Sequence, residues 1–160
     1  MIDGPAVVAA MEAAGFTHLV WIPDSHFGTW ESALVRSKLA PIRPCREGEA
    51  VGIAAGLILG GAKPLVVIQC TGFFEAGDAV RNVVYDLKLP LKMIVGVRSM
   101  MAWFARKTTD NCPHFIEPLM RAWELPFTPF VPMSSDPDEL REMLTEFSGK
   151  PTASVILWAE

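Results

Sequence analysis

Residues 45–70 read CREGEAVGIAAGLILGGAKPLVVIQC, and this stretch predicts a helix, a turn and a buried strand in succession. Residues 47–61 are small or apolar except for two acids at the start, which is typical of a tightly buried helix. Gly61 and Pro64 then end the helix and lead into 65–70, a run rich in Val, Leu and Ile. Such a run fits a parallel strand that is covered on both faces.

The same alternation of apolar runs and helical segments recurs along the whole chain, and it predicts an α/β fold. Gly15 and Gly149 stand at predicted helix ends as Gly61 does, and Ser135 or Asp136 is positioned to cap the last helix. The predicted strands are 18–23, 41–45, 65–70, 91–97, 127–131 and 153–158, and the predicted helices are 4–14, 28–39, 47–61, 75–87, 114–123 and 136–147. We therefore expect a single three-layer αβα domain over residues 1–160 with a mostly parallel six-stranded sheet.

Composition limits the classes of function. The chain has 160 residues, of which 51% are hydrophobic, enough to build the core of one domain. A net charge of -4 argues against nucleic acids and acidic membranes as partners. The uncharged stretch 50–62 is too short to span a bilayer, and the acidic start without basic residues gives no secretory signal, so we expect a cytoplasmic location. Cys45, Cys70 and Cys112 lack the paired spacings of a metal site, so no metal ligand is expected on this chain.

Polar residues follow several of the predicted strands. Ligands of open parallel sheets bind beyond the carboxyl ends of the strands. Asp24, Ser25 and His26 follow the first strand, 69–72 close the third, and Arg98 follows the fourth. Exposed loops are commonly polar, and Asp or Ser often caps a helix, so this convergence alone leaves a structural interpretation open.

Glu47 and Glu49 open the helix of 47–61. An acid in the first turn is stabilised by the helix dipole, which explains either residue without a ligand. A carboxylate at a buried helix start can also share a proton with a bound molecule. Because the two side chains point about 200° apart around the helix, only one of them can face such a ligand.

Three segments around this helix carry a resemblance to a known family. The residues are 45–50 (CREGEA), 52–56 (GIAAG) and 61–64 (GAKP), with supporting matches at 22–25 (IPDS), 69–72 (QCTG) and 110–114 (DNCPH) in the same order. The chain resembles the pyrimidine-binding domain of thiamine diphosphate enzymes. More narrowly, it resembles the α subunit of sulfopyruvate decarboxylase and the matching half of phosphonopyruvate decarboxylase.

The resemblance implies a 2-oxo acid decarboxylase that uses thiamine diphosphate and Mg2+. Glu47 occupies the position of the family glutamate, which contacts N1′ of the aminopyrimidine and favours loss of the C2 proton of the thiazolium; Glu49 is left with a helix-dipole role. The candidate site comprises Glu47, His114 and His26 as catalytic residues, Glu47, Thr71, Gly72 and Phe73 at the cofactor, and Asp24, Ser25, His26 and Arg98 at the substrate. A hydrogen-bonded surface role is the alternative for His26.

The chain departs from the family pattern in two places. After Gln69 the family has Asn-Ser-Gly-Leu-Gly-Asn, whereas residues 70–75 read CTGFFE, so the resemblance does not fix the substrate. The Gly-Asp-Gly start and later Asn-Asn of the diphosphate-binding domain are absent; 77–79 (GDA) is the nearest string. The resemblance thus implies a separate β subunit that holds the diphosphate and the metal, and hence a hetero-oligomer.

Three alternatives stay open. Segment 100–104, which is rich in Met and aromatic residues and precedes Arg106 and Lys107, has two interpretations. It belongs to the core or to a subunit interface, or it forms a lid over the cofactor. The same cofactor supports carbon–carbon ligation as well as decarboxylation. A non-catalytic, flavodoxin-like binding module is the third alternative, although 23–28 (PDSHFG) is no glycine-rich phosphate turn.

Overall fold

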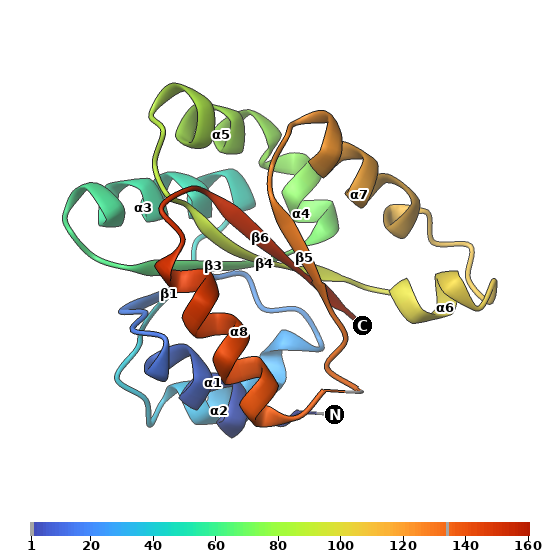
Figure 1. The fold of residues 1–160 in the computed structure, drawn as a ribbon, viewed down its shortest axis with the longest axis horizontal. Helices are drawn as coiled ribbons and strands as arrows, with labels where there is room; N and C mark the ends of the chain where they lie inside the picture. The colour runs from blue at the N-terminus through green and yellow to red at the C-terminus, as the bar shows by residue number, and fades with distance from the viewer. Residues whose placement is uncertain (1, 134) are drawn as a thin grey trace.

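A computed structural model describes residues 2–133 and 135–160. These residues form a six-stranded sheet in the order β2-β1-β3-β4-β6-β5, and every neighbouring pair is parallel (Figure 1). The α/β prediction is confirmed, and the sheet is wholly rather than mostly parallel. The strands are β1 (His18–Trp21), β2 (Ala40–Ile42), β3 (Pro64–Gln69), β4 (Lys92–Val97), β5 (Phe127–Phe130) and β6 (Ser154–Ala159).

Helices cover both faces of the sheet (Figure 1). One face carries α1 (Gly4–Ala13), the short turn η1 (Phe27–Trp30), α2 (Glu31–Leu34) and α8 (Pro137–Gly149). The other face carries α3 (Glu47–Leu59), α4 (Cys70–Glu75), α5 (Gly77–Arg81), the π-helical turn η2 (Asn82–Asp86) and α7 (Cys112–Ala122). The short helix α6 (Met100–Phe104) projects beyond one end of the sheet.

The core consists of two layers, one on each side of the sheet. In β3, Leu65 and Val67 belong to the layer beneath α1 and α8, whereas Val66 and Ile68 belong to the layer beneath α3. All four side chains are fully buried. Alternate side chains of a strand point to opposite faces, so a strand covered on both faces must be apolar at every position. The run in 65–70 is therefore explained by its central place in the sheet.

Two of the three glycines predicted at helix ends have the same backbone conformation. Gly15 and Gly61 have φ of 80° and 84°, and each follows a helix whose last carbonyls accept hydrogen bonds from the next backbone N–H groups. Glycine enters this left-handed region without the cost that a Cβ imposes. Gly149 differs, because it is the last residue of α8. At the start of α8, Asp136 is the cap, and its Oδ1 accepts from the Glu139 N–H at 2.8 Å.

Two predicted helices were wrong in extent. The segment 28–39 is helical only to Leu34, where the Ser37 hydroxyl donates to the Leu34 carbonyl at 2.8 Å and ends the helix. The segment 75–87 is divided between α4, α5 and η2, and α4 begins at Cys70, which had been placed in the preceding strand. Gly77 is the first residue of α5, and a Cβ built on it would lie 3.2 Å from the ring of Trp123. The helix α6 was not predicted.

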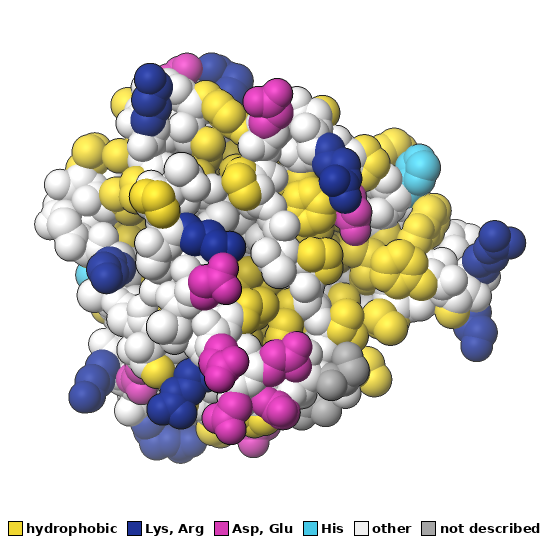
Figure 2. Space-filling model, viewed as in Figure 1, with side chains coloured by type: hydrophobic (Ala, Val, Ile, Leu, Met, Phe, Trp, Pro, Cys, Tyr) yellow, Lys and Arg dark blue, Asp and Glu magenta, His cyan; other side chains and the backbone are white. Residues whose placement is uncertain are grey.

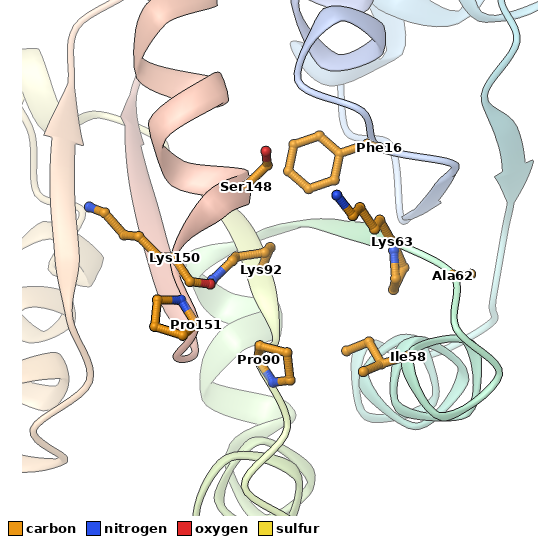
Figure 3. Close-up of a pocket in the computed structure, with 10 residues that line it drawn as sticks. Phe16, Ile58, Ala62, Lys63, Pro90, Lys92, Ser148, Lys150 and Pro151 are labelled. Atoms are coloured by element: carbon orange, nitrogen blue, oxygen red, sulfur yellow. The ribbon is translucent and has the colours of Figure 1, made fainter.

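The amino ends of β3 and β4 border a cavity of about 160 Å3 (Figure 3). Phe16, Ile58 and Pro90 are among its lining residues. Lys92 reaches past it, and its Nζ donates to the carbonyl oxygens of Lys150 at 2.8 Å and of Thr152. The Lys150 side chain points away from the cavity. Because the cavity lies at the edge where the strands begin, it is separate from the edge at which ligands of parallel sheets bind.

Replacing Lys92 with Met is expected to lower the free energy of unfolding by about 1–3 kcal/mol, since two carbonyl groups lose the donor with which they form partly buried hydrogen bonds. Burial, and then the charge of Lys150, lower the pKa of Lys92 from 10.5 to about 8. The unfolded chain therefore binds more protons between pH 8 and 10.5, so the wild type gains stability over that range relative to the Met variant. Urea unfolding at pH 7.5 and 10 measures both effects. Lys150→Met is the control, because the surface ion pair of Lys150 with Glu146 contributes little to stability. An equal loss of stability in the two variants would show that the hydrogen bonds of Lys92 are not what stabilises this region.

In the described ranges, no helix is both long enough and apolar enough to pass through a bilayer.

Candidate active site

Predicted site residues from four loops lie at the carboxyl edge of the sheet. The strand β1 has β2 on one side and β3 on the other. The connection from β1 to β2 and the connection from β3 to β4 therefore run in opposite directions across the sheet, and they diverge between β1 and β3. Divergence of this kind opens the crevice in which ligands of doubly wound sheets bind. The helices α3 and α4 also begin here, which brings Glu47 and the residues after β3 to the same edge.

Glu47 lies directly against Gly72. A Cβ built on Gly72 would be 2.3 Å from Cγ, 2.4 Å from Oε1 and 2.6 Å from Cδ of Glu47. The Glu47 side chain thus occupies the space that any other residue at 72 would fill. It is half-buried, and no residue within 2–133 or 135–160 forms a hydrogen bond or ion pair with its carboxylate.

Two other carboxylates satisfy the start of α3. Glu49 is exposed, and its Oε2 accepts from the Cys45 N–H at 2.8 Å. Glu75 accepts from the Gly48 N–H at 3.0 Å and pairs with Arg46 at 2.8 Å. Backbone N–H groups at a helix start need such acceptors. Because Glu49 and Glu75 supply them, the Glu47 carboxylate is left available for a ligand.

The residues that follow β3 divide between surface and core. Thr71 is exposed, and Gly72 lies beside Glu47. The Phe73 side chain is fully buried, with its ring centroid 5.8 Å from that of Trp123. The side chain of Phe73, which was expected at the cofactor, therefore belongs to the core.

Asp24 organises the loop after β1. Its Oδ1 accepts from the N–H groups of His26 at 2.9 Å and Phe27 at 2.8 Å, and its Oδ2 accepts from the Gln69 side-chain amide. Arg98 approaches the same Oδ2 at 3.8 Å. Asp24 and Arg98, which sequence analysis placed at the substrate, therefore lie together, and Asp24 caps the turn as well. Ser25 is exposed.

His26 lies at the inner wall of this loop. The Trp158 Nε1–H donates to His26 Nε2 at 3.2 Å, which requires an unprotonated Nε2 and hence a neutral ring. Burial lowers the pKa of His26, and the negative charge of Asp24 opposes this shift only in part. Both observations favour a neutral imidazole that carries its proton on Nδ1.

His114 is exposed on the first turn of α7. Its ring centroid lies 5.7 Å from that of Trp103 in α6 and 4.8 Å from that of Phe115. It shares no described contact with His26, Asp24 or Glu47. The structure thus brings Asp24, His26 and Arg98 together, sets Glu47 against Gly72, and places His114 in a separate aromatic group.

Sequence analysis missed Glu160 at this edge. Its Oε1 is buried and makes no hydrogen bond with the described residues. Burial and the charge of Asp24 raise the pKa of Glu160 to about 7, against the opposing effect of Arg98. The signal that identified Asp24 and Arg98 was also present here, because Glu160 directly follows a buried strand. Within the described ranges, no cluster of three or more His, Cys, Asp and Glu side chains is arranged to hold a metal ion.

Comparison with known sequences gives two relatives, whereas no family model matches the chain. The sulfopyruvate decarboxylase of Methanosarcina acetivorans is 34% identical over 67 residues, which cover 42% of this chain and 17% of that protein. The sulfopyruvate decarboxylase subunit alpha of Methanococcus maripaludis is 25% identical over 146 residues, which cover 89% of this chain and 83% of that protein.

Comparison with solved structures shows the same fold in larger proteins. A thiamine diphosphate-dependent 4-hydroxybenzoylformate decarboxylase from Rhodococcus jostii RHA1 matches with a TM-score of 0.67 and 16% identity, over 99% of this chain and 30% of that one. A split-gene transketolase in an inactive beta4 tetramer matches with a TM-score of 0.59 and 18% identity, over 98% of this chain and 49% of that one. This chain therefore spans half or less of these structures and a sixth of the Methanosarcina protein. The chain has the fold of a domain of thiamine diphosphate-dependent enzymes, and among their sequences it resembles sulfopyruvate decarboxylase.

Proposed function

We propose that this chain is the α subunit of a two-chain, thiamine diphosphate-dependent 2-oxo acid decarboxylase. The observation that carries the proposal is the half-buried Glu47 carboxylate, which lies against Gly72 and has no partner among the described residues. The relative in Methanococcus maripaludis, a sulfopyruvate decarboxylase subunit alpha, supports the assignment over most of the chain.

The residues present fit the pyrimidine half of the cofactor. Glu47 would contact its N1′ atom, and the Gly72 backbone together with exposed Thr71 would border the ring. When bound, thiamine diphosphate supplies the nucleophilic carbon and the electron sink that decarboxylation needs. The diphosphate and Mg2+ would be held by a partner chain, in keeping with the family pattern that the sequence lacks.

The chain's own residues would position the reactants and move protons. Glu47 would hold the proton that its carboxylate exchanges with N1′. Arg98, whose side chain is about half exposed, would receive the acid group of the substrate, with Asp24 fixing its approach. His26 would accept or return a proton near the reacting carbon, provided that the Trp158 N–H releases Nε2. His114 would join them only if the segment between α6 and α7 folds inward.

Carbon dioxide release tests the proposal. This chain is co-expressed with its β chain and incubated with a panel of 2-oxo acids, with and without thiamine diphosphate and Mg2+. We expect release that requires both chains and the cofactor, and none from this chain alone. A stable, cofactor-loaded complex that releases no carbon dioxide would reject the proposal, leaving carbon–carbon ligation or a binding role.

The surface around α6 is expected to contact the partner chain. Phe104 and Phe115 are 66% and 51% exposed there, and Figure 2 shows hydrophobic side chains gathered over α6 and α7 with basic side chains at the projecting end. Exposed apolar patches rimmed by charge are typical of protein interfaces. This patch adjoins the edge where a second half-site would complete the active site.

Phe104→Asp should therefore weaken association with the β chain at least about tenfold, the effect of truncating an interface anchor. Leu59→Asp is the matched control, because Leu59 is 71% exposed but ends α3 at the opposite edge of the sheet. Titration calorimetry of the two chains measures the difference. If Phe104→Asp changes only self-association of this chain, the surface joins two copies and the prediction is wrong.

A further inference from the structure

Glu160 occupies a space that Gly96 leaves open. A Cβ built on Gly96 would be 2.5 Å from Glu160 Oε1 and 2.7 Å from two ring carbons of Phe27. Phe27 is fully buried, so one side of the Glu160 carboxyl is apolar. Asp24 and Arg98 are the charged groups that act on this carboxyl, and the neutral His26 ring, which accepts from the Trp158 Nε1–H, belongs to the loop that Asp24 caps. No hydrogen bond from the described residues reaches Oε1.

The charge of this group of residues depends on Glu160. With Glu160 protonated, Arg98 and Asp24 neutralise each other, and the exposed guanidinium can turn toward an incoming anion. With Glu160 ionised, two carboxylates share one arginine, and their net charge becomes negative. An anionic ligand is then repelled, and the arginine is drawn inward.

We infer that Glu160 is a positioning residue that sets the charge of the Asp24–Arg98 pair, and through it the affinity of the site for the anionic group of a 2-oxo acid. The consequence for the substrate rests on the proposed function. Affinity should be higher while Glu160 is protonated, so KM should rise with pH across the range in which Glu160 loses its proton. The rise should be about 3–10-fold between pH 6 and 8, with a smaller change in kcat.

The first test does not depend on enzymatic turnover. It measures the free energy of unfolding of the full chain as a function of pH for the wild type and for Glu160→Gln. The pKa of Glu160 is raised in the folded protein from 4.5 to about 7, so its contribution to stability is present below pH 4.5 and is lost as pH rises toward 7. The free energy of unfolding of the wild type minus that of the variant should therefore decrease from pH 4.5 to about 7 and stay constant at higher pH. A difference that does not change with pH would overturn the inference.

The second test uses the complete two-chain complex. Glu160→Gln imitates the protonated side chain, so its KM should stay low and independent of pH from 6 to 8 while the wild-type KM rises. Glu142→Gln, an exposed acid on α8, is the control and should behave as wild type. A wild-type KM that ignores pH, or a Gln variant that keeps the rise, would overturn the role of Glu160. Complete lack of turnover in wild type and control would instead reject the proposed function, and the stability test would still decide whether Glu160 titrates near neutrality.

Discussion

Glu47→Gln is expected to reduce carbon dioxide release by about 100- to 10,000-fold, the range that general acid–base catalysis contributes. Glutamine keeps the size and shape of the side chain but cannot exchange a proton. Since the Glu47 carboxylate has no partner among the described residues, its loss should change the free energy of unfolding by less than about 0.5 kcal/mol. Single-turnover assays of the two-chain complex, together with urea unfolding of the chain, measure both quantities.

Glu49→Gln is the matched control on the same turn of α3. Its carboxylate accepts from the Cys45 N–H, so the variant should lose about 0.5–1 kcal/mol of stability and keep its activity. The two acids are thus expected to separate catalysis from helix stability. Near-normal turnover of Glu47→Gln, or loss of turnover in Glu49→Gln alone, would show that the wrong carboxylate has been assigned.

Gly72→Ala should have the second largest effect. The added Cβ would be 2.3 Å from Glu47 Cγ, far inside van der Waals contact, so the Glu47 side chain or the start of α4 must move. Overpacking of this kind costs about 1–3 kcal/mol of stability. Displacement of a catalytic carboxylate by about an ångström costs roughly 100-fold in rate. Activity should therefore fall far more than the loss of stability explains.

Gly52→Ala provides the comparison, because Gly52 lies in α3 with Glu47 and a Cβ there meets nothing within 4 Å. Replacing this helical glycine should raise the free energy of unfolding by about 0.5–1 kcal/mol and leave turnover unchanged. Carbon dioxide release at saturating thiamine diphosphate, with a parallel titration of the cofactor, measures the effect on each variant. Equal activity in the two alanine variants would mean that the contact between Gly72 and Glu47 has no part in the reaction.

Much of the fold follows from local pattern. Buried strands in a parallel sheet must be apolar on both faces, so 65–70 and 91–97 were predicted within one residue at each end. Ser135 or Asp136 was predicted as the cap of α8, and the cap is Asp136, whose side chain accepts from a backbone N–H only three residues away. Asp24 and Arg98 each follow a predicted parallel strand, which predicted that they lie at the same edge of the sheet. In the structure an Arg98 guanidinium nitrogen lies 3.8 Å from Asp24 Oδ2. Effects that act over a few residues, or that follow from strand direction, can be deduced from sequence alone.

Other features depend on contacts between distant segments, and only the tertiary structure decided them. The start of α5 packs against a distant segment, because Gly77 lies close to Trp123, forty-six residues away in the chain. The burial of Phe73 has the same origin, since its ring packs on Trp123 as well. Glu160 acquires its environment from Gly96, Asp24 and Arg98, which lie on other strands and loops. The sequence determined most of the strands and helices, because backbone preference and burial are local, whereas the surroundings of Glu47 and Glu160 were decided by the packing of segments far apart in the chain.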